Sequence, residues 1–415
     1  MTPRPPARRA TAPSPAAALA AVLAACVVGA CARSGAPLVG LPPGGQPFDP
    51  SLFGGGPDPW RTLPRPFWRA QPAPDAGAAS LRGVHAVNGA VAWASGSNGT
   101  VLRTTDGGTT WRRRPVPGAE ALDFRSVWAF DSLTALVASA GEAAAGQARI
   151  YRTTDGGRSW TLVHQDSTRG AFFDALAFWD RQYGLVLSDP VGEGSHRHFL
   201  VLATSDGGAT WRRTPAEGMP GALPDEAAFA AGNAALGLAD DTRAWFVTGG
   251  PNGARVYTTT TGGARWDAVA APVAARGASA GLFAVAGAPQ GGQSTVAANL
   301  RERTPRRLPA PAIAVGGDYR QARAGTGQMA RTDDGTRWER ADPGGTAPGY
   351  WSGLAYVPGL ARTAVAVGGG GTAVTRDDGR TWAVVDSAEW NAVSFTGAGE
   401  GWAVGPGGRV ARVGR

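Results

Sequence analysis

An eight-residue pattern that recurs six times constrains the fold of this 415-residue chain more than any other feature. Its first copy, at residues 104–111, reads TTDGGTTW, and the shared pattern is Thr-x-Asp-x-Gly-x-x-Trp. Four copies fill every key position, whereas one carries Thr261 in place of the Asp and another carries Arg331 in place of the Thr. A unit that recurs in this way predicts an architecture of similar supersecondary repeats.

The chemistry of the octet is that of a tight turn between two strands. A turn Asp accepts hydrogen bonds from nearby backbone N–H groups, the second Gly adopts a backbone angle that other residues resist, and the Trp buries a large ring at the start of the next strand. We therefore interpret the octets as structural hairpins and not as ligand sites. Their Asp and Trp positions are Asp106, Trp111, Asp155, Trp160, Asp206, Trp211, Trp266, Asp333, Trp338, Asp377 and Trp382.

Each repeat reads as four short strands, and the octet joins the third strand to the fourth. In the second repeat we expect these strands at 124–130, 134–139, 149–153 and 159–164. Four-stranded units of this length are typical of β-propeller blades. One interval between motif Trp residues, of 72 residues, exceeds the others, which are 44 to 55. We expect an insertion there, at about 288–311, between strands one and two of the fifth blade.

The two ends of the repeat region predict how the propeller closes. The last segment supplies three strands, at 390–395, 401–405 and 409–413, and the sequence stops before a fourth. The stretch 66–70 resembles the start of the fourth strands and precedes the first blade. We therefore predict an all-β, seven-bladed β-propeller over residues 65–415. Its N-terminal strand completes the last blade and removes the open sheet edge.

The first 64 residues read as export signal and linker. Residues 1–31 combine an Arg-containing start with an apolar run too short to span a bilayer, which is typical of a signal peptide. Two lipobox-like sites end in Cys26 and Cys31. We predict lipidation at Cys31, which follows the longer apolar run; Cys26 is the alternative, and an ordinary secretory peptide is another interpretation. Residues 32–64 form a Gly/Pro-rich linker. We expect an exported, membrane-anchored lipoprotein of the periplasm or outer membrane.

Charge and cysteine content argue against several function classes. The net charge is +8 and all 40 basic residues are Arg, but they are scattered along the chain, so we expect no nucleic-acid binding. No Cys follows Cys31, which argues against disulfides and thiol-based sites in the propeller. His196 and His198 lack a third ligand nearby and read as loop residues. We predict no metal, no cofactor and a monomeric chain.

The repeats resemble a known family. WASGSNG at 93–99, followed by LRTTDGG at 102–108, resembles the repeat of photosystem II stability/assembly factor-like proteins, within the wider BNR/Asp-box group. Further segments resemble a non-photosynthetic bacterial branch of that family: AFFDA at 171–175, LSDP at 187–190, EAAFAA at 226–231 and GGDYR at 316–320. The resemblance covers about residues 65–415. It implies an exported scaffold or assembly role and leaves the client unspecified. Our first hypothesis is therefore a propeller that binds a protein partner and has no catalysis.

An enzyme is the second hypothesis. Sialidases also carry the Asp-box, and they use an arginine cluster with a Tyr nucleophile backed by a Glu. This chain has no Phe/Tyr-Arg-Ile-Pro motif, although its six tyrosines leave a Tyr/Glu pair open. A glycosidase-like or small-metabolite activity therefore stays as the alternative function, with no catalytic residue assigned.

Seven polar residues break the repeat pattern on or beside the expected inner strands of blades three to five. We predict that they form one polar binding site at the central channel, where propellers often bind ligands. The other interpretation is ordinary turn chemistry, since Asp beside Gly or Pro is common in turns. The seven residues are Asp174, Asp189, Glu226, Asn233, Asp318, Tyr319 and Arg320.

Overall fold

The computed structural model describes residues 67–239, 242–274, 276–289, 310–323, 328–341, 349–397 and 399–413. Every described residue lies within the unit Pro42–Arg415. The predicted signal peptide, both candidate lipidation cysteines and the predicted linker therefore fall outside the described residues.

The described residues form seven antiparallel four-stranded sheets, one for each blade. Blade 1 comprises β2 (Leu81–Ala86), β3 (Ala92–Gly96), β4 (Thr100–Thr104) and β5 (Arg112–Arg113). Blade 2 comprises β6 (Phe124–Ala129), β7 (Ala135–Ser139), β8 (Arg149–Thr153) and β9 (Thr161–Gln165). Blade 3 comprises β10 (Phe173–Phe178), β11 (Gly184–Val191), β12 (His198–Thr204) and β13 (Arg212–Arg213). Blade 4 comprises β14 (Leu236–Leu238), β15 (Ala244–Val247), β16 (Arg255–Thr259) and β17 (Asp267–Ala270).

The remaining blades follow the same order. Blade 5 comprises β18 (Ala280–Gly287), β19 (Ala312–Asp318), β20 (Gln328–Thr332) and β21 (Glu339–Arg340). Blade 6 comprises β22 (Trp351–Tyr356), β23 (Ala364–Gly368), β24 (Gly371–Thr375) and β25 (Ala383–Asp386). Blade 7 comprises β26 (Ala392–Gly397), β27 (Glu400–Val404), β28 (Val410–Val413) and β1 (Trp68–Gln71). Residues 288–311 separate the first two strands of blade 5, and 290–309 lie outside the described residues.

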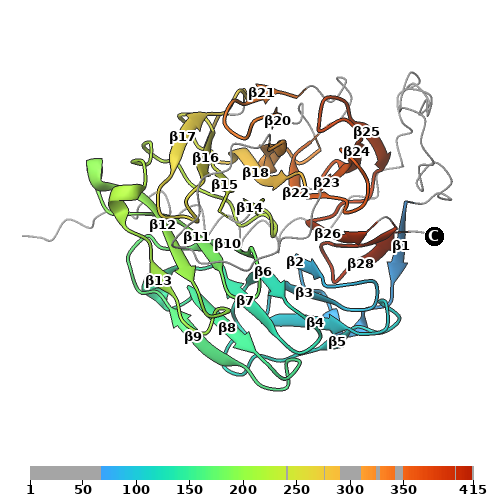
Figure 1. The fold of residues 1–415 in the computed structure, drawn as a ribbon. Helices are drawn as coiled ribbons and strands as arrows, with labels where there is room; N and C mark the ends of the chain where they lie inside the picture. The colour runs from blue at the N-terminus through green and yellow to red at the C-terminus, as the bar shows by residue number, and fades with distance from the viewer. Residues whose placement is uncertain are drawn as a thin grey trace, which may run out of the picture. The chain divides into compact units, whose positions relative to one another are not determined.

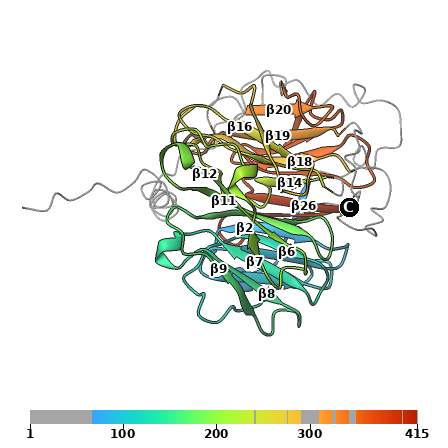
Figure 2. The same cartoon turned by 60° about the vertical axis from the view of Figure 1, so that its left-hand side comes forward.

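The first strand of each blade contacts the first strand of the next, in the closed cycle β2, β6, β10, β14, β18, β22, β26 and back to β2. Figures 1 and 2 show the sheets following one another around this ring, with β26 of the last blade beside β2 of the first. The predicted seven-bladed, all-β propeller is confirmed. The first strands line a central axis, which we call the channel.

The ring closes through an N-terminal strand, as the sequence predicts. Strand β1 pairs antiparallel with β28, with Trp68 opposite Val413 and Gln71 opposite Val410. The Trp68 side chain is only 4% exposed. Its indole N–H donates to the Thr372 hydroxyl at 2.8 Å, which ties blade 7 to blade 6. The closing strand thus supplies both a sheet edge and a buried ring.

The core lies between neighbouring blades. Between blades 2 and 3, for example, Leu136 and Ile150 of one sheet pack against Leu176, Val186 and Trp211 of the next. All six motif Trp residues are buried or half-buried. Each sheet is therefore apolar on both faces and is covered by both of its neighbours.

The octets form the expected turns. In blade 1 the Asp106 carboxylate accepts the backbone N–H and the hydroxyl of Thr110, at 2.9 and 2.6 Å. The Thr104 hydroxyl donates to Asp106 and accepts the Gly108 N–H, both at 2.9 Å. The carboxylates of Asp155, Asp206 and Asp377 make the equivalent bonds in their own turns.

Blade 5 differs from the sequence-based assignment of its turn. The Asp334 carboxylate, not that of Asp333, accepts the backbone N–H of Arg337 at 2.8 Å. The turn is one residue shorter, since the Gly335 N–H reaches the Thr332 hydroxyl three residues back instead of four. Asp333 instead pairs with the buried Arg331 and, at 3.0 Å, with Arg380 of blade 6. The assignment of Asp333 to the turn is therefore corrected to Asp334.

Strand direction separates two ends of the propeller. Because neighbouring strands run antiparallel, the hairpins between strands one and two lie at the same end as the Asp-box turns. The connections between strands two and three, and those between blades, lie at the other end, which we call the channel mouth. Helical structure in the described residues is limited to five short 3₁₀ segments, at Pro74–Ala76, Ala143–Ala145, Gly194–His196, Ala216–Gly218 and Tyr319–Gln321. None of the helices described here has the length and apolar character needed to cross a membrane.

Candidate binding site at the channel mouth

A β-bulge recurs near the start of the first strand in most blades. The register shifts at Arg82 in β2, Arg125 in β6 and Asp174 in β10, and again at Phe283 in β18 and Ser352 in β22. A bulge leaves one residue outside the regular ladder and redirects its side chain. The residue before each bulge is a large apolar one and the residue after it is small, whereas the bulge residues vary from Arg to Asp, Phe and Ser.

Residues 226–233, which we call the channel segment, cross the ring at these bulges. Arg82 donates from Nη1 to the Ala231 carbonyl oxygen at 3.0 Å, and Arg125 donates to the Ala230 carbonyl oxygen at 3.3 Å. On the blade 3 side, the Asp189 carboxylate accepts the Ala228 N–H at 2.9 Å. Charged side chains from three blades therefore hold the main chain of one extended segment.

An aromatic cluster anchors the same segment. Phe229 is buried and its ring lies 4.4 Å from that of Phe283, centroid to centroid. Tyr319 lies 6.4 Å from Phe229, and Tyr350 lies 5.4 Å from Phe283. Contacts of this geometry between aromatic rings stabilise their packing beyond area burial alone. Phe229 is the anchoring side chain of the channel segment.

The far end of the segment reaches the opposite wall. A Cβ atom added to Gly232 would lie 2.7 Å from the carbonyl oxygens of both Asn391 and Ser352, so no other residue fits. The Asn233 side chain accepts the Val127 N–H at 2.9 Å and donates to the Val127 carbonyl oxygen at 3.1 Å. With the bonds of Ala227 and Glu226 to blade 4, the segment touches all seven blades and occupies the channel at its mouth.

Asp174 and Asp189 form a pair of carboxyl groups beneath the segment. Burial, and secondarily the Asp189 charge, raises the pKa of Asp174 well above its ordinary value, while Arg125 and the Ala230 amide oppose the shift. Burial likewise raises the pKa of Asp189 to about 7, against the lowering influence of the Ala228 N–H and Arg197. Asp174 is 1% exposed, and neither of its carboxyl oxygens makes a hydrogen bond of ordinary geometry with the described residues.

The two arginines of the site influence each other electrostatically. Burial, with the neighbouring Arg125 charge, lowers the pKa of Arg82. Arg125 itself pairs with Asp123, Nε to carboxylate oxygen, at 2.8 Å. The site therefore combines two guanidinium groups with two mainly buried carboxyl groups, and its polarity changes from one wall to the other.

The seven residues predicted from sequence lie at the channel mouth but divide into separate groups. The Asp189 charge acts on Asp174, and the Tyr319 ring lies beside Phe229 of the channel segment. Glu226 is fixed elsewhere: it accepts the Thr248 hydroxyl at 2.6 Å and the Arg255 Nε–H at 3.0 Å.

The remaining predicted residues have local roles or face solvent. Asn233 bonds to blade 2, as described above. Asp318 caps its own turn by accepting the Arg320 N–H at 2.9 Å, and the Arg320 side chain is exposed. Whether any of the seven binds a ligand stays a prediction.

Sequence reasoning missed Arg82, Arg125 and Phe283. They belong to the first strands, which recur in every blade. The sequence-based prediction selected polar residues that break the repeat pattern near turns, and these three residues are not of that kind. Aligning the first strands would have shown one position that varies between blades while its neighbours repeat. That position is the bulge, and it faces the channel segment.

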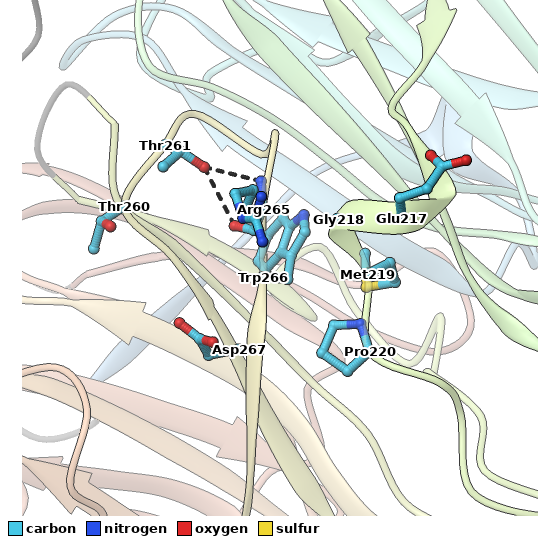
Figure 3. Close-up of a pocket in the computed structure, with 9 residues that line it drawn as sticks. All are labelled: Glu217, Gly218, Met219, Pro220, Thr260, Thr261, Arg265, Trp266 and Asp267. Carbon is cyan, nitrogen blue, oxygen red and sulfur yellow. Dashed lines mark hydrogen bonds between the residues drawn. The ribbon is translucent and has the colours of Figure 1, made fainter.

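A separate hollow of about 380 Å³ lies at the altered turn of blade 4. In Figure 3 the Thr261 hydroxyl bonds to the main chain of Arg265, where the other turns carry an Asp carboxylate. Glu217, Met219 and Pro220 form the other wall. The Arg265, Glu217 and Asp267 side chains are exposed, so this hollow is a shallow, solvated groove.

In the described part of the chain, no group of three His, Cys, Asp or Glu side chains is placed to hold an ion. His196 and His198 lie at η4 and the start of β12, and the His198 ring bonds to the His196 carbonyl oxygen at 2.8 Å.

The fold and the closing strand define a seven-bladed β-propeller whose channel mouth is filled by its own main chain. Among solved structures, the chain is similar to YCF48 bound to a D1 peptide, with a TM-score of 0.57 and 17% identity over 85% of this chain and 96% of that one. It is also similar to YCF48 from Cyanidioschyzon merolae (TM-score 0.54, 17% identity, 84% and 98% covered). An ancestral GH74 enzyme gives a TM-score of 0.54 and 15% identity, with 82% of this chain and 46% of that chain covered.

No protein-family model and no curated protein sequence matches the chain. At these identities the likeness concerns the fold. At that level the expected resemblance to photosystem II assembly factor-like propellers is confirmed.

Proposed function

We propose that this chain is an exported, lipid-anchored protein-binding scaffold or assembly factor for an envelope or membrane protein complex. The observation that carries the proposal is the way in which Arg82, Arg125 and Asp189 hold the main chain of residues 228–231. A wall that binds carbonyl oxygens on one side and an N–H group on the other is suited to an extended protein segment.

The structural comparisons favour the same reading. One similar propeller has been solved with a D1 peptide bound, so a protein segment is a ligand that this architecture accepts. Because one fold can carry many functions, the function is inferred from the residues of the site.

Export and anchoring complete the proposal. A lipid on Cys31, or on Cys26, together with the linker at 32–64, would place the propeller at a membrane surface with slack to reach a client. Mass spectrometry of the mature N-terminus tests this part. A diacylated Cys at either position supports the anchor, and an unmodified mature N-terminus contradicts it.

Capture of the partner from solubilised envelopes tests the binding function. The bait is the full chain, wild type or carrying Arg320→Glu at the channel mouth; Arg340→Glu, on an exposed outer strand of the same blade, is the matched control. We expect one protein to be enriched by the wild type and by Arg340→Glu, and less by Arg320→Glu. Failure of the wild type to enrich any protein contradicts the proposal.

A glycosidase-like enzyme is the second candidate. It is favoured by the paired carboxyl groups of Asp174 and Asp189, because a carboxyl with a raised pKa is what a general acid needs. The GH74 fold similarity points the same way. The channel segment covers Asp174, however, and leaves no open path to it among the described residues. Turnover of an oligosaccharide that is lost in Asp174→Asn and kept in Asp180→Asn would favour the enzyme.

A further inference from the structure

The channel segment is held in the manner of a bound peptide. Main-chain groups make the contacts: the carbonyl oxygens of Ala230 and Ala231, the N–H of Ala228, and both main-chain groups of Ala227, which pair with Gly249 at 3.0 Å in each direction. Recognition through main-chain groups binds any sequence that can lie extended. Most positions of the segment could therefore carry other side chains without losing these contacts to the site.

One side chain anchors the segment in the site. Between residues 227 and 232 the segment reads Ala-Ala-Phe-Ala-Ala-Gly, so Phe229 is the only side chain larger than a methyl group. Its ring packs on Phe283, with Tyr319 and Tyr350 around that pair. An aromatic side chain in a pocket of aromatic residues is a typical anchor of a protein interface.

The segment offers no side-chain partner to Asp174. Asp174 is buried, its carboxyl oxygens make no hydrogen bond of ordinary geometry with the described residues, and the side chains of the segment there are methyl groups. The Ala230 N–H is the group of the segment that lowers the pKa of this carboxyl. A buried polar group that is incompletely bonded destabilises the folded state. The site therefore offers an acceptor that no side chain of the segment uses. Since Arg82 and Arg125 already place two positive charges here, a neutral hydroxyl or amide donor fits better than another cation.

We propose that residues 227–232 occupy, in cis, the peptide-binding site of the scaffold, and that the client segment is an extended small–aromatic–small sequence carrying a hydroxyl or amide side chain beside the aromatic residue. The proposal rests on the proposed protein-binding function and names its site, its ligand class and its autoinhibition. The tethered segment competes at a high effective concentration, so the client must displace it.

The experiment uses the full chain, wild type and Phe229→Ala, with fluorescent peptides. The reference peptide is EAAFAAGN, which copies residues 226–233. Three further peptides carry a single Ser at the position of Ala228, Ala230 or Ala231, and a fifth carries Ala at the position of Phe229. Fluorescence polarisation measures each dissociation constant.

We expect Phe229→Ala to bind the reference peptide at least tenfold more tightly than the wild type does, because its own anchor is missing. At least one Ser peptide should bind a further fivefold more tightly, and that gain should vanish in Asp174→Asn/Phe229→Ala. The peptide without Phe should not bind. A folded Phe229→Ala that binds no peptide, or a Ser preference that survives Asp174→Asn, overturns the proposal.

Hydrogen exchange of the wild type covers the case in which Phe229→Ala fails to fold. Excess Ser peptide should accelerate exchange of the amides of residues 226–233 at least threefold, and unchanged exchange overturns the proposal. The two proposals fail separately: loss of peptide binding with an envelope partner still captured removes the channel-mouth site and leaves the scaffold function.

Discussion

The Arg412 guanidinium, on the last strand of the chain, donates to the Gly107 carbonyl oxygen in the first Asp-box turn at 2.8 Å, across 305 residues of sequence. It also donates to the Gly89 carbonyl oxygen at 2.9 Å and lies 5.0 Å from the Trp402 ring centroid. Arg152 makes the matching bond to Gly207 of the next blade at 3.0 Å. The Asp-box is therefore also the acceptor through which one blade is tied to its neighbour.

Removing this tie should open the ring at its closure. Arg412→Ala loses two hydrogen bonds and a cation–π contact, so we expect its free energy of unfolding to fall by about 2 kcal/mol. Urea denaturation measures the change, and Arg340→Ala, an exposed arginine on an outer strand, is the control. Equal midpoints for the two variants would show that the tie contributes nothing.

Strand β1 should contribute more to the free energy of unfolding than its four residues would suggest. Trp68→Ala removes a buried ring and its bond to Thr372, which predicts a loss of about 3–5 kcal/mol. The same denaturation experiment measures it, with Leu133→Ala as the exposed control. A loss below about 1 kcal/mol would contradict closure by β1 as a source of stability.

Restoring the missing carboxylate of blade 4 should stabilise the fold. In Thr261→Asp, the new carboxylate can accept the Arg265 N–H that the Thr261 hydroxyl now accepts at 2.9 Å. We expect an increase of about 0.5–1 kcal/mol by analogy with helix-capping residues. Thr260→Asp, one residue earlier, is the matched control. A destabilised Thr261→Asp together with an unchanged control would contradict this account of the turn.

The buried carboxyl pair predicts a pH dependence of stability. The folded-state pKa values of Asp174 and Asp189 are raised, Asp189 to about 7, so their protonated forms favour the fold. This contribution is complete below the unfolded pKa of about 4 and is lost as pH rises through the folded values. Asp174→Asn should therefore match the wild type at pH 4 and exceed it by about 1–2 kcal/mol at pH 8. Thermal denaturation from pH 4 to 8 measures this, and an Asp174→Asn that is less stable at pH 8 contradicts it.

The fold could be predicted from the sequence because the octet forms a turn through contacts between residues close in sequence. Asp106 binds atoms four residues away, so the pattern that identifies the turn also fixes the hairpin. The closing strand could be predicted for a related reason: the sequence after blade 6 supplies only three strand patterns for blade 7, and residues 66–70 match the start of a fourth strand. The sequence did not predict that the turn of blade 5 uses Asp334 instead of Asp333, because either of these adjacent aspartates can be aligned with the Asp of the octet.

Less of the site could be predicted from the sequence, because its contacts join residues that lie far apart in the chain. Arg82 meets Ala231 across 149 residues, and Arg125 meets Ala230 across 105. No local pattern reports that a connection between blades 3 and 4 crosses the ring to touch blades 1 and 2. The sequence pointed to Asp174 and Asp189 through their departure from the repeat, but their arginine counterparts lie inside it.

Site-specific photo-crosslinking in the intact envelope tests the central claim, that the channel mouth is the face that binds a client protein. A photoreactive amino acid replaces Arg320 at the channel mouth or Leu133 in a hairpin at the opposite end of the blades. The account predicts one discrete protein adduct from position 320 and none from position 133. Absence of an adduct from position 320, or the same adduct from both positions, would contradict it.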